Sequence, residues 1–497
     1  MKYDTIIIGS GAGGGTLASK LANAGQNILI LERGGWLARE PQNWNESEVF
    51  VKGRYVSPDT WLDATGKPFQ PQVHYNVGGA TKFYGAALFR LRRQDFGRVA
   101  HRYGISPAWP ISYDDLERYY SAAEQMYHVH GRHGDDITEA TWSQQYPHEP
   151  VSHSPRIEEI SAKLQAGGYH PFHAPSAVLL NEKRPELSAC IRCNTCDGHP
   201  CLVNGKADAD VIAVRPIIDY PNVTLLTNAE VVQLFPGNGG IRLVQVQREG
   251  KSEFYKADNV VLAAGAVNSA KILLQSGMNS SGQVGANYMC HNSKAVMAID
   301  TQPNATVFQK TLALHDFLWG DDQYPYPMGS IQMVGKSCAA AMRSESKLAA
   351  VAPELPLAEI ARRSVDFWLT TEDLPVHSNR VSVLPQSGRV QLSYTPNNVN
   401  SANELYKRLK ALMHHTGMDR HVVFTSKTIG LAGTAHQAGT ARMGDDPASS
   451  VVDATGRSHE LANLWIADAS VFPSIGAVNP ALTVMAHALR VGDQLLS

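Results

Sequence analysis

Residues 5–35 read TIIIGSGAGGGTLASKLANAGQNILILERGG. A short apolar run is followed by a glycine-rich turn, then by a segment of small and apolar residues, and then by a second apolar run. This order predicts a strand, a turn, a helix and a second strand. Such a βαβ unit is typical of an α/β protein with a parallel sheet.

Gly9, Gly11 and Gly14 have G-x-G-x-x-G spacing between the predicted strand and helix. In that place one glycine makes a tight turn, one lets the backbone approach a pyrophosphate, and one lets the helix pack closely. The helix N-terminus then faces the phosphates. The second strand ends at Glu32, where a carboxylate can accept hydrogen bonds from both ribose hydroxyls. Because this acid repels a 2′-phosphate, the motif predicts FAD or NAD rather than NADP.

The rest of the chain contains further predicted helices and strands. Pro110, Ser112 and the acids that follow indicate a helix start. Alternating apolar residues in 222–235 and 240–266 indicate antiparallel strands followed by a buried strand. We also expect helices within 267–277, 401–415 and 479–496, strands at 380–384 and 389–394, and a surface loop over 131–149.

Composition excludes several classes of protein. The chain has 497 residues, of which 43% are apolar and 18% charged, as in a folded protein with a substantial core. Lys and Arg number 44 against 46 Asp and Glu, so no basic footprint for nucleic acid is present. The first apolar run is too brief for a signal-peptide core, and no run approaches the roughly 18 apolar residues of a membrane span. We therefore expect a cytoplasmic protein.

The whole chain resembles the glucose-methanol-choline (GMC) oxidoreductases, a family of FAD-dependent oxidases and dehydrogenases of alcohols and sugars. The matching segments occur in the family's order and are 9–22 with 30–35, 76–91, 109–120, 259–277, 436–446 and 463–490. The resemblance implies an α/β fold in which a discontinuous Rossmann-type FAD-binding domain carries an inserted α+β substrate-binding domain. The FAD-binding domain is expected to comprise 1–98, 205–290 and 428–497, and the substrate-binding domain 99–204 and 291–427.

The same resemblance implies which residues contact FAD. Gly78 and Gly79 match a second FAD-contacting loop, and Asp468 matches a residue near the ribityl chain and phosphates. Val231 matches a position beside adenine, although plain core burial is an equal alternative for it. The expected set is Gly9, Gly11, Gly14, Glu32, Arg33, Gly78, Gly79, Val231, Ala264, Gly265, Asp468, Ala469 and Pro480.

FAD is expected to be bound without a covalent link. Relatives that tether flavin through histidine place it four residues after the second glycine of this loop, where this chain has Phe83. A phenyl ring cannot form that bond.

His436 and Asn479 are the expected catalytic residues. They match the histidine–asparagine pair of the sugar-oxidising branch, which includes pyranose oxidase and bacterial glycoside 3-oxidases and dehydrogenases. An imidazole can accept the proton of a substrate hydroxyl, and the amide can hold the same oxygen. The alternatives are a satisfied histidine in a glycine-rich turn and an Asn-Pro helix cap.

The branch implies oxidation of a secondary ring hydroxyl of a sugar or glycoside to a ketone, with O2 or another acceptor taking the electrons. Two alternatives remain open: an oxidase or dehydrogenase of a non-sugar alcohol, and a non-catalytic electron-relay subunit. The intact pair disfavours the second.

Residues 189–206 read ACIRCNTCDGHPCLVNGK and contain four of the six cysteines. The C-x2-C-x2-C-x4-C spacing is close to an iron–sulfur run, but the last spacing is longer and no proline follows Cys201. Some sugar dehydrogenases of the family carry a cluster at this place. An iron–sulfur cluster is therefore possible, as are zinc, free thiols or local disulfides. We expect a structural element and no metal site.

Overall fold

The computed structural model describes residues 2–345, 350, 352–418 and 422–497. Its first sheet is parallel throughout, with the strand order β10-β2-β1-β14-β24. The bounds of these strands are β1 Tyr3–Ile8, β2 Ile28–Leu31, β10 Val223–Leu226, β14 Ala257–Leu262 and β24 Leu464–Ile466. Because β1 and β2 flank α1 (Ala12–Asn23), the predicted βαβ unit is confirmed.

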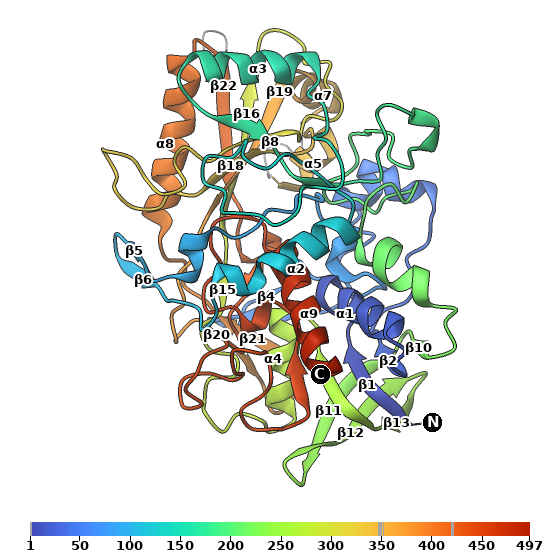
Figure 1. Cartoon of the computed structure of the whole chain (residues 1–497). Coiled ribbons are helices and arrows are strands. Elements are labelled where there is room, and N and C mark those ends of the chain that lie inside the picture. Colours follow the sequence, from blue (N-terminus) through green and yellow to red (C-terminus); the bar gives the residue numbers. More distant parts are fainter. Residues whose placement is uncertain (1, 346–349, 351, 419–421) are drawn as a thin grey trace.

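Both faces of this parallel sheet are buried. Ile7, Ile30 and Val261 face one core, which they share with residues of α1 and of the C-terminal helix α9 (Ala481–Leu496). Their sequence neighbours Ile6, Leu29 and Val260 face the opposite core, because side chains alternate along a strand. That second core includes apolar residues of an antiparallel sheet with the order β11-β12-β13 and bounds Glu230–Gly237, Gly240–Arg248 and Lys251–Tyr255. Figure 1 shows α1 and α9 side by side against the parallel sheet.

A second large sheet is antiparallel and lies at the opposite end of the molecule (Figure 1). Its order is β22-β16-β19-β18-β17-β8, with bounds Val423–Thr428, Asn292–Ile299, Ser364–Thr371, Ser330–Met333, Leu312–Leu314 and Pro171–His173. Apolar residues of α3 (Pro155–Ala166) and α8 (Val399–His415) pack on one face of it. A parallel sheet combined with a separate antiparallel sheet confirms the predicted α/β class.

Smaller elements connect these two parts. Three two-stranded ladders pair β15 Met289–Cys290 with β23 Gln437–Ala438, β5 Val99–His101 with β6 Gly104–Ser106, and β7 Val129–His130 with β9 Ser176–Ala177. A four-stranded sheet has the order β20-β21-β3-β4, with bounds Arg380–Val383, Val390–Ser393, Trp61–Asp63 and Pro68–Phe69. In this sheet β3 and β4 come from the expected FAD-binding domain, and β20 and β21 from the expected substrate-binding domain. The boundaries of the two domains stay a prediction.

The helices expected from their sequence signals form. Ser112 caps α2 (Tyr113–Met126) by accepting a hydrogen bond from the backbone of Asp115, as the Ser and acid spacing indicates. The helix expected within 267–277 is α4 (Ala266–Gln275). Two shorter helices, α5 (Ala339–Glu345) and α7 (Glu354–Arg363), precede β19. Within the part of the chain that the structure describes, no helix is both long and apolar enough to cross a membrane.

Two sequence expectations differ from the structure. The run 222–235 is expected to be antiparallel, but Asn228 takes a left-handed conformation and divides it, so β10 joins the parallel sheet and only β11 the antiparallel one. The loop over 131–149 is irregular as expected, but His133 and Asp136 in it are buried. Asp136 is held there by an ion pair with Arg92 and a hydrogen bond from His315, two residues that are remote in sequence.

Candidate active site

A cavity of about 360 Å³ opens at the carboxyl ends of the parallel strands. In α/β sheets ligands bind at this edge, since the turns after neighbouring strands converge there. The predicted residues that line the cavity are Gly9, Gly11, Glu32, Arg33, Gly79, Val231, Ala264, Gly265, His436, Asp468, Ala469, Asn479 and Pro480. Gly14 and Gly78 do not line it, and each has a packing role described below.

The glycine turn after β1 has no room for side chains. Gly9 has a φ of +101°, and a Cβ there would lie 2.4 Å from the carbonyl oxygen of Ala263. A Cβ on Gly14 would lie 1.9 Å from the carbonyl oxygen of Gly9, so Gly14 lets α1 approach the turn rather than touching a ligand. Helix α1 follows with no side chain capping its N-terminus. Its first backbone N–H groups can therefore bind a pyrophosphate.

Glu32 follows β2 and is buried at the edge of the cavity. One carboxylate oxygen accepts hydrogen bonds from the backbone and the hydroxyl of Ser10, at 3.0 and 2.6 Å. The other accepts one from the backbone of Gly34 at 2.9 Å. Burial raises the pKa of Glu32, whereas these hydrogen bonds oppose the rise. The second oxygen retains a lone pair that can accept a ribose hydroxyl.

The region around Arg33 is also preorganised. Its guanidinium donates two hydrogen bonds to Asp59, at 2.8 and 2.7 Å, and lies 4.0 Å from the centre of the Tyr75 ring. The Tyr75 hydroxyl donates to the same Asp59 at 2.6 Å. Val231 lines the cavity and is also buried, so it both contacts the cavity and packs in the core. Sequence analysis missed Ser10, Asp59 and Tyr75, of which only Ser10 carries a signal, inside the glycine motif.

The GG loop lies against the glycine turn. The backbone N–H of Gly78 donates to the Ser10 hydroxyl at 3.2 Å, so Gly78 connects the two loops instead of lining the cavity. A Cβ on Gly79 would lie 3.0 Å from Gly11, which shows how closely the loops approach. Phe83 lines the cavity and stacks on His74, with 3.8 Å between ring centres.

Asp468 ties together two turns at the same edge of the sheet. Its Oδ2 accepts hydrogen bonds from the hydroxyl of Ser269 at 2.5 Å and from the backbone of Gly265 at 3.0 Å. Its Oδ1 accepts one from the backbone of Ser470 at 2.9 Å. The turns after β14 and β24 are therefore held in a fixed relation where they line the cavity.

His436 lies opposite a second buried histidine because of strand register. Strands β15 and β23 pair Met289 with Ala438 and Cys290 with Gln437. The next antiparallel pair is His291 and His436, whose Nδ1 atoms lie 2.9 Å apart. The other ring nitrogen of His291, Nε2, lies 3.0 Å from the carbonyl oxygen of Gly476.

This chain of contacts determines the tautomers. A carbonyl oxygen only accepts, so Nε2 of His291 carries a proton and donates it to Gly476. Burial and the neighbouring His436 lower the pKa of His291 well below its ordinary value, so its Nδ1 is an unprotonated acceptor. His436 must then donate from Nδ1, which leaves its Nε2 with a free lone pair. Burial lowers the pKa of His436 to about 4, and the ring is a neutral base at neutral pH.

Asn479 lies in the loop just before α9 and lines the cavity with His436. Its side-chain oxygen accepts a hydrogen bond from Nε2 of Gln332 at 2.9 Å. Pro480 is the N-cap residue of α9, and no side chain caps that end. The amide nitrogen of Asn479 is thus available as a donor in the cavity that His436 also lines.

The cysteine segment packs beside the GG loop. The buried ammonium of Lys206 donates to the carbonyl oxygens of Lys82, Cys196 and His199, at 3.1, 2.7 and 2.9 Å. The cysteines are free thiols. Among the described residues, no group of three or more His, Cys, Asp or Glu side chains is arranged to hold a metal ion. That the segment is a structural element stays a prediction.

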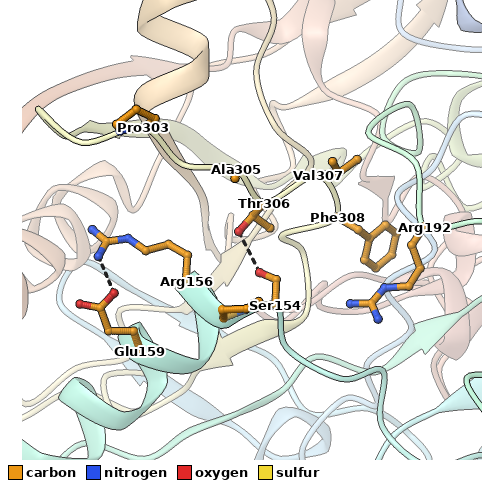
Figure 2. Close-up of a pocket in the computed structure, with 10 residues that line it drawn as sticks. Ser154, Arg156, Glu159, Arg192, Pro303, Ala305, Thr306, Val307 and Phe308 are labelled. Carbon is orange, nitrogen blue, oxygen red and sulfur yellow. Dashed lines mark hydrogen bonds and ion pairs between the residues drawn. The ribbon is translucent and has the colours of Figure 1, made fainter.

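A second hollow lies at the start of α3 (Figure 2), and none of its lining residues lines this cavity. Ser154 and Thr306 contact each other through their hydroxyls at 2.8 Å. Arg156 pairs with Glu159 and Asp300, and Arg192 pairs with Glu182. The cationic side chains of this hollow are therefore already neutralised, and we assign the hollow no role in the chemistry.

The lining residues fit FAD. An acid at the end of β2, a cradle that excludes side chains and an uncapped helix N-terminus suit the ribose and pyrophosphate of a dinucleotide. The same cavity continues to a neutral imidazole and an amide donor, the groups that an alcohol undergoing oxidation needs.

Comparison with known proteins identifies the family. Two GMC oxidoreductase family models match the chain, one over residues 3–293 and the other over residues 378–488. The chain is 29% identical to 6'''-hydroxyparomomycin C oxidase of Streptomyces lividus, with 100% of this chain and 91% of that protein covered. It is 28% identical to paromamine 6'-oxidase of Streptomyces fradiae, with 98% and 90% covered.

The fold is also that of a solved structure. The crystal structure of pyridoxine 4-oxidase from Mesorbium loti matches with a TM-score of 0.67 at 18% identity, covering 99% of each chain. The first family model alone spans more than half of the sequence, and membership implies FAD as the cofactor. The chain therefore belongs to the GMC oxidoreductases, FAD-dependent enzymes that act on CH–OH groups.

Proposed function

We propose that this enzyme oxidises a secondary ring hydroxyl of a sugar or glycoside to a ketone. The observation that carries the proposal is the placement of His436 and Asn479 in the cavity that the glycine turn and Glu32 also line. O2 or another acceptor removes the electrons, and the reaction takes place in the cytoplasm.

The two side chains suit an alcohol oxygen. The hydroxyl donates its hydrogen to the free Nε2 of His436, and the same oxygen accepts a hydrogen bond from the amide nitrogen of Asn479. His436 takes the proton as the C–H bond breaks, and Asn479 stabilises the negative charge that develops on oxygen. FAD, when bound, supplies the acceptor for the hydride. His291 keeps the His436 ring in the reactive tautomer through their 2.9 Å contact.

A sugar substrate is supported by the histidine–asparagine pair and by relatives whose names contain sugar-derived compounds. Those names also support a second candidate. Paromamine 6'-oxidase is named for position 6', so oxidation of a hydroxyl at that position of an aminoglycoside is the alternative.

Product analysis tests the proposal and separates the two candidates. The enzyme is mixed anaerobically with monosaccharides, methyl glycosides, paromamine and simple alcohols, and the loss of oxidised flavin absorbance is recorded. The products of the methyl glycosides and of paromamine, whose glycosidic anomeric carbons borodeuteride does not reduce, are then reduced with borodeuteride and hydrolysed. A ring ketone gives back the parent sugar together with an epimer, both labelled on a ring carbon. An aldehyde gives only the parent sugar, labelled on its terminal carbon, and would support the alternative.

The alternative hypothesis, a non-catalytic electron-relay subunit, predicts a different result in the same experiment. If no alcohol reduces the flavin and a chemical reductant does so normally, the proposed function is wrong. Reduction by simple alcohols but by no sugar would instead contradict the substrate class.

The flavin is expected to be released on denaturation. Phe83 stands where covalent relatives have their histidine, and its ring stacks on His74. Precipitation with acid should leave yellow flavin in the supernatant. Flavin that remains in the washed pellet would show a covalent link and contradict this prediction.

A further inference from the structure

Strand β18 carries polar residues on one face and apolar residues on the other. Ile331 and Met333 belong to the core under α3 and α8. Ser330 and Gln332 alternate with them and face the opposite way, as the period of a strand requires. Ser330 contacts Nε2 of His315 at 2.8 Å, and Gln332 contacts Asn479.

Gln332 is buried, with 4% of its surface exposed, and it is not among the described residues that line the cavity. A buried amide is unfavourable unless it is hydrogen-bonded. Its Nε2 lies 2.9 Å from Oδ1 of Asn479, across the boundary between the antiparallel sheet and the loop before α9. Gln332 therefore reaches the cavity only through the side chain of Asn479.

We infer that Gln332 is a positioning residue that selects the orientation of the Asn479 amide. This inference rests on the proposed function, in which Asn479 binds the substrate oxygen. By donating to Oδ1, Gln332 turns Nδ2 toward the cavity and makes Asn479 a donor there.

The donors and acceptors of the site support this orientation of the Asn479 amide. His436 donates to His291 and presents an acceptor to the cavity. An alcohol that donates to this acceptor needs a donor for its oxygen, and a ketone product has only acceptor capacity. With the Asn479 amide reversed, its Oδ1 would face that oxygen and two acceptors would meet. Because Gln332 donates to Asn479, this arrangement is avoided. His436 and Asn479 then present one acceptor and one donor, which an alcohol complements.

Replacing the Gln332 amide with a carboxylate tests whether Gln332 donates the hydrogen bond to Asn479. In Gln332→Glu the ionised side chain only accepts, so Asn479 must reverse and present Oδ1 to the cavity. We expect kcat/KM to fall roughly 10- to 100-fold at pH 8 for the best alcohol found in the panel. We expect partial recovery as the pH is lowered, because the protonated acid can donate again. Gln332→Met, of similar size, should lose roughly tenfold and show no such recovery.

The controls separate positioning from folding. Ser330 lies on the same face of β18 as Gln332, and Ser330→Ala removes its contact with His315. It should affect thermal stability but leave the pH profile as in the wild type. A Gln332→Glu enzyme with an unchanged pH profile would overturn the inference. Unchanged flavin reduction in His436→Ala would instead contradict the proposed function.

A stability measurement needs no substrate. Melting temperatures of the flavin-loaded enzyme are compared for Gln332→Met, Asn479→Ala and the double variant. A hydrogen bond between the two side chains predicts that the double variant loses less than the sum of the single losses. Additive losses would contradict the contact, and with it the inference.

Discussion

Replacing His436 with alanine is expected to slow reduction of the enzyme by its alcohol substrate by a factor on the order of 10² to 10⁴, the usual contribution of a positioned base. The reason is that Nε2 of His436 carries the free lone pair in the site, since Nδ1 is engaged by His291 at 2.9 Å. Flavin content should not change, because the residues that would hold the ribose and pyrophosphate of FAD, Glu32 and the glycine turn, are other parts of the cavity lining. Anaerobic stopped-flow measurement of flavin absorbance gives the rate.

The pH dependence of kcat/KM gives the control for this result. Burial lowers the pKa of His436 to about 4, so the base is neutral and active above that value. In the wild type kcat/KM should be level near neutrality and fall as the pH drops through about 4, where His436 becomes protonated. The alanine variant should lack this acid limb. A variant that reduces at the wild-type rate would show that His436 is not the base.

The sequence was informative wherever function depends on a local motif. The glycine turn after β1, the acid after β2 and the turns after β14 and β24 all converge because parallel strands end at one edge. Each of these signals lies within a few residues of its strand. This locality explains why the βαβ unit, the glycine turn and Glu32 could be predicted from the residues alone. The turns after β14 and β24, His436 and Asn479 were expected instead from the resemblance of their segments to the family.

Contacts between distant segments could not be derived in the same way. His291 and His436 are 145 residues apart in the chain, and only the register of β15 and β23 places them opposite each other. Gln332 is 147 residues from Asn479 and looks like an ordinary polar position of a strand. The burial of Asp136 likewise depends on Arg92 and His315. No spacing rule connects such residues, so their pairing required the tertiary structure.

The second large effect is expected at Asn479. Asn479→Ala removes the donor to the substrate oxygen and should lower kcat by a factor of roughly 10² to 10³, the loss on removing one positioned donor. Asn479→Asp keeps the shape of the side chain, and Gln332 can still donate to it as it does at 2.9 Å to Asn479. The aspartate therefore removes the donor while it keeps the packing of the side chain.

The aspartate should be at least as harmful as the alanine. Above the pKa of the new carboxyl, its charge faces the negative charge that develops on the substrate oxygen, and repulsion adds to the lost hydrogen bond. If Asn479 served only as a helix cap, the effect would be small, because Asp caps helices about as well as Asn. In the structure the Asn479 side-chain oxygen accepts its hydrogen bond from Gln332, and no side chain caps α9. Wild-type rates in the aspartate variant would support the cap, whereas a loss equal to or greater than that of alanine would place the amide donor in the reaction.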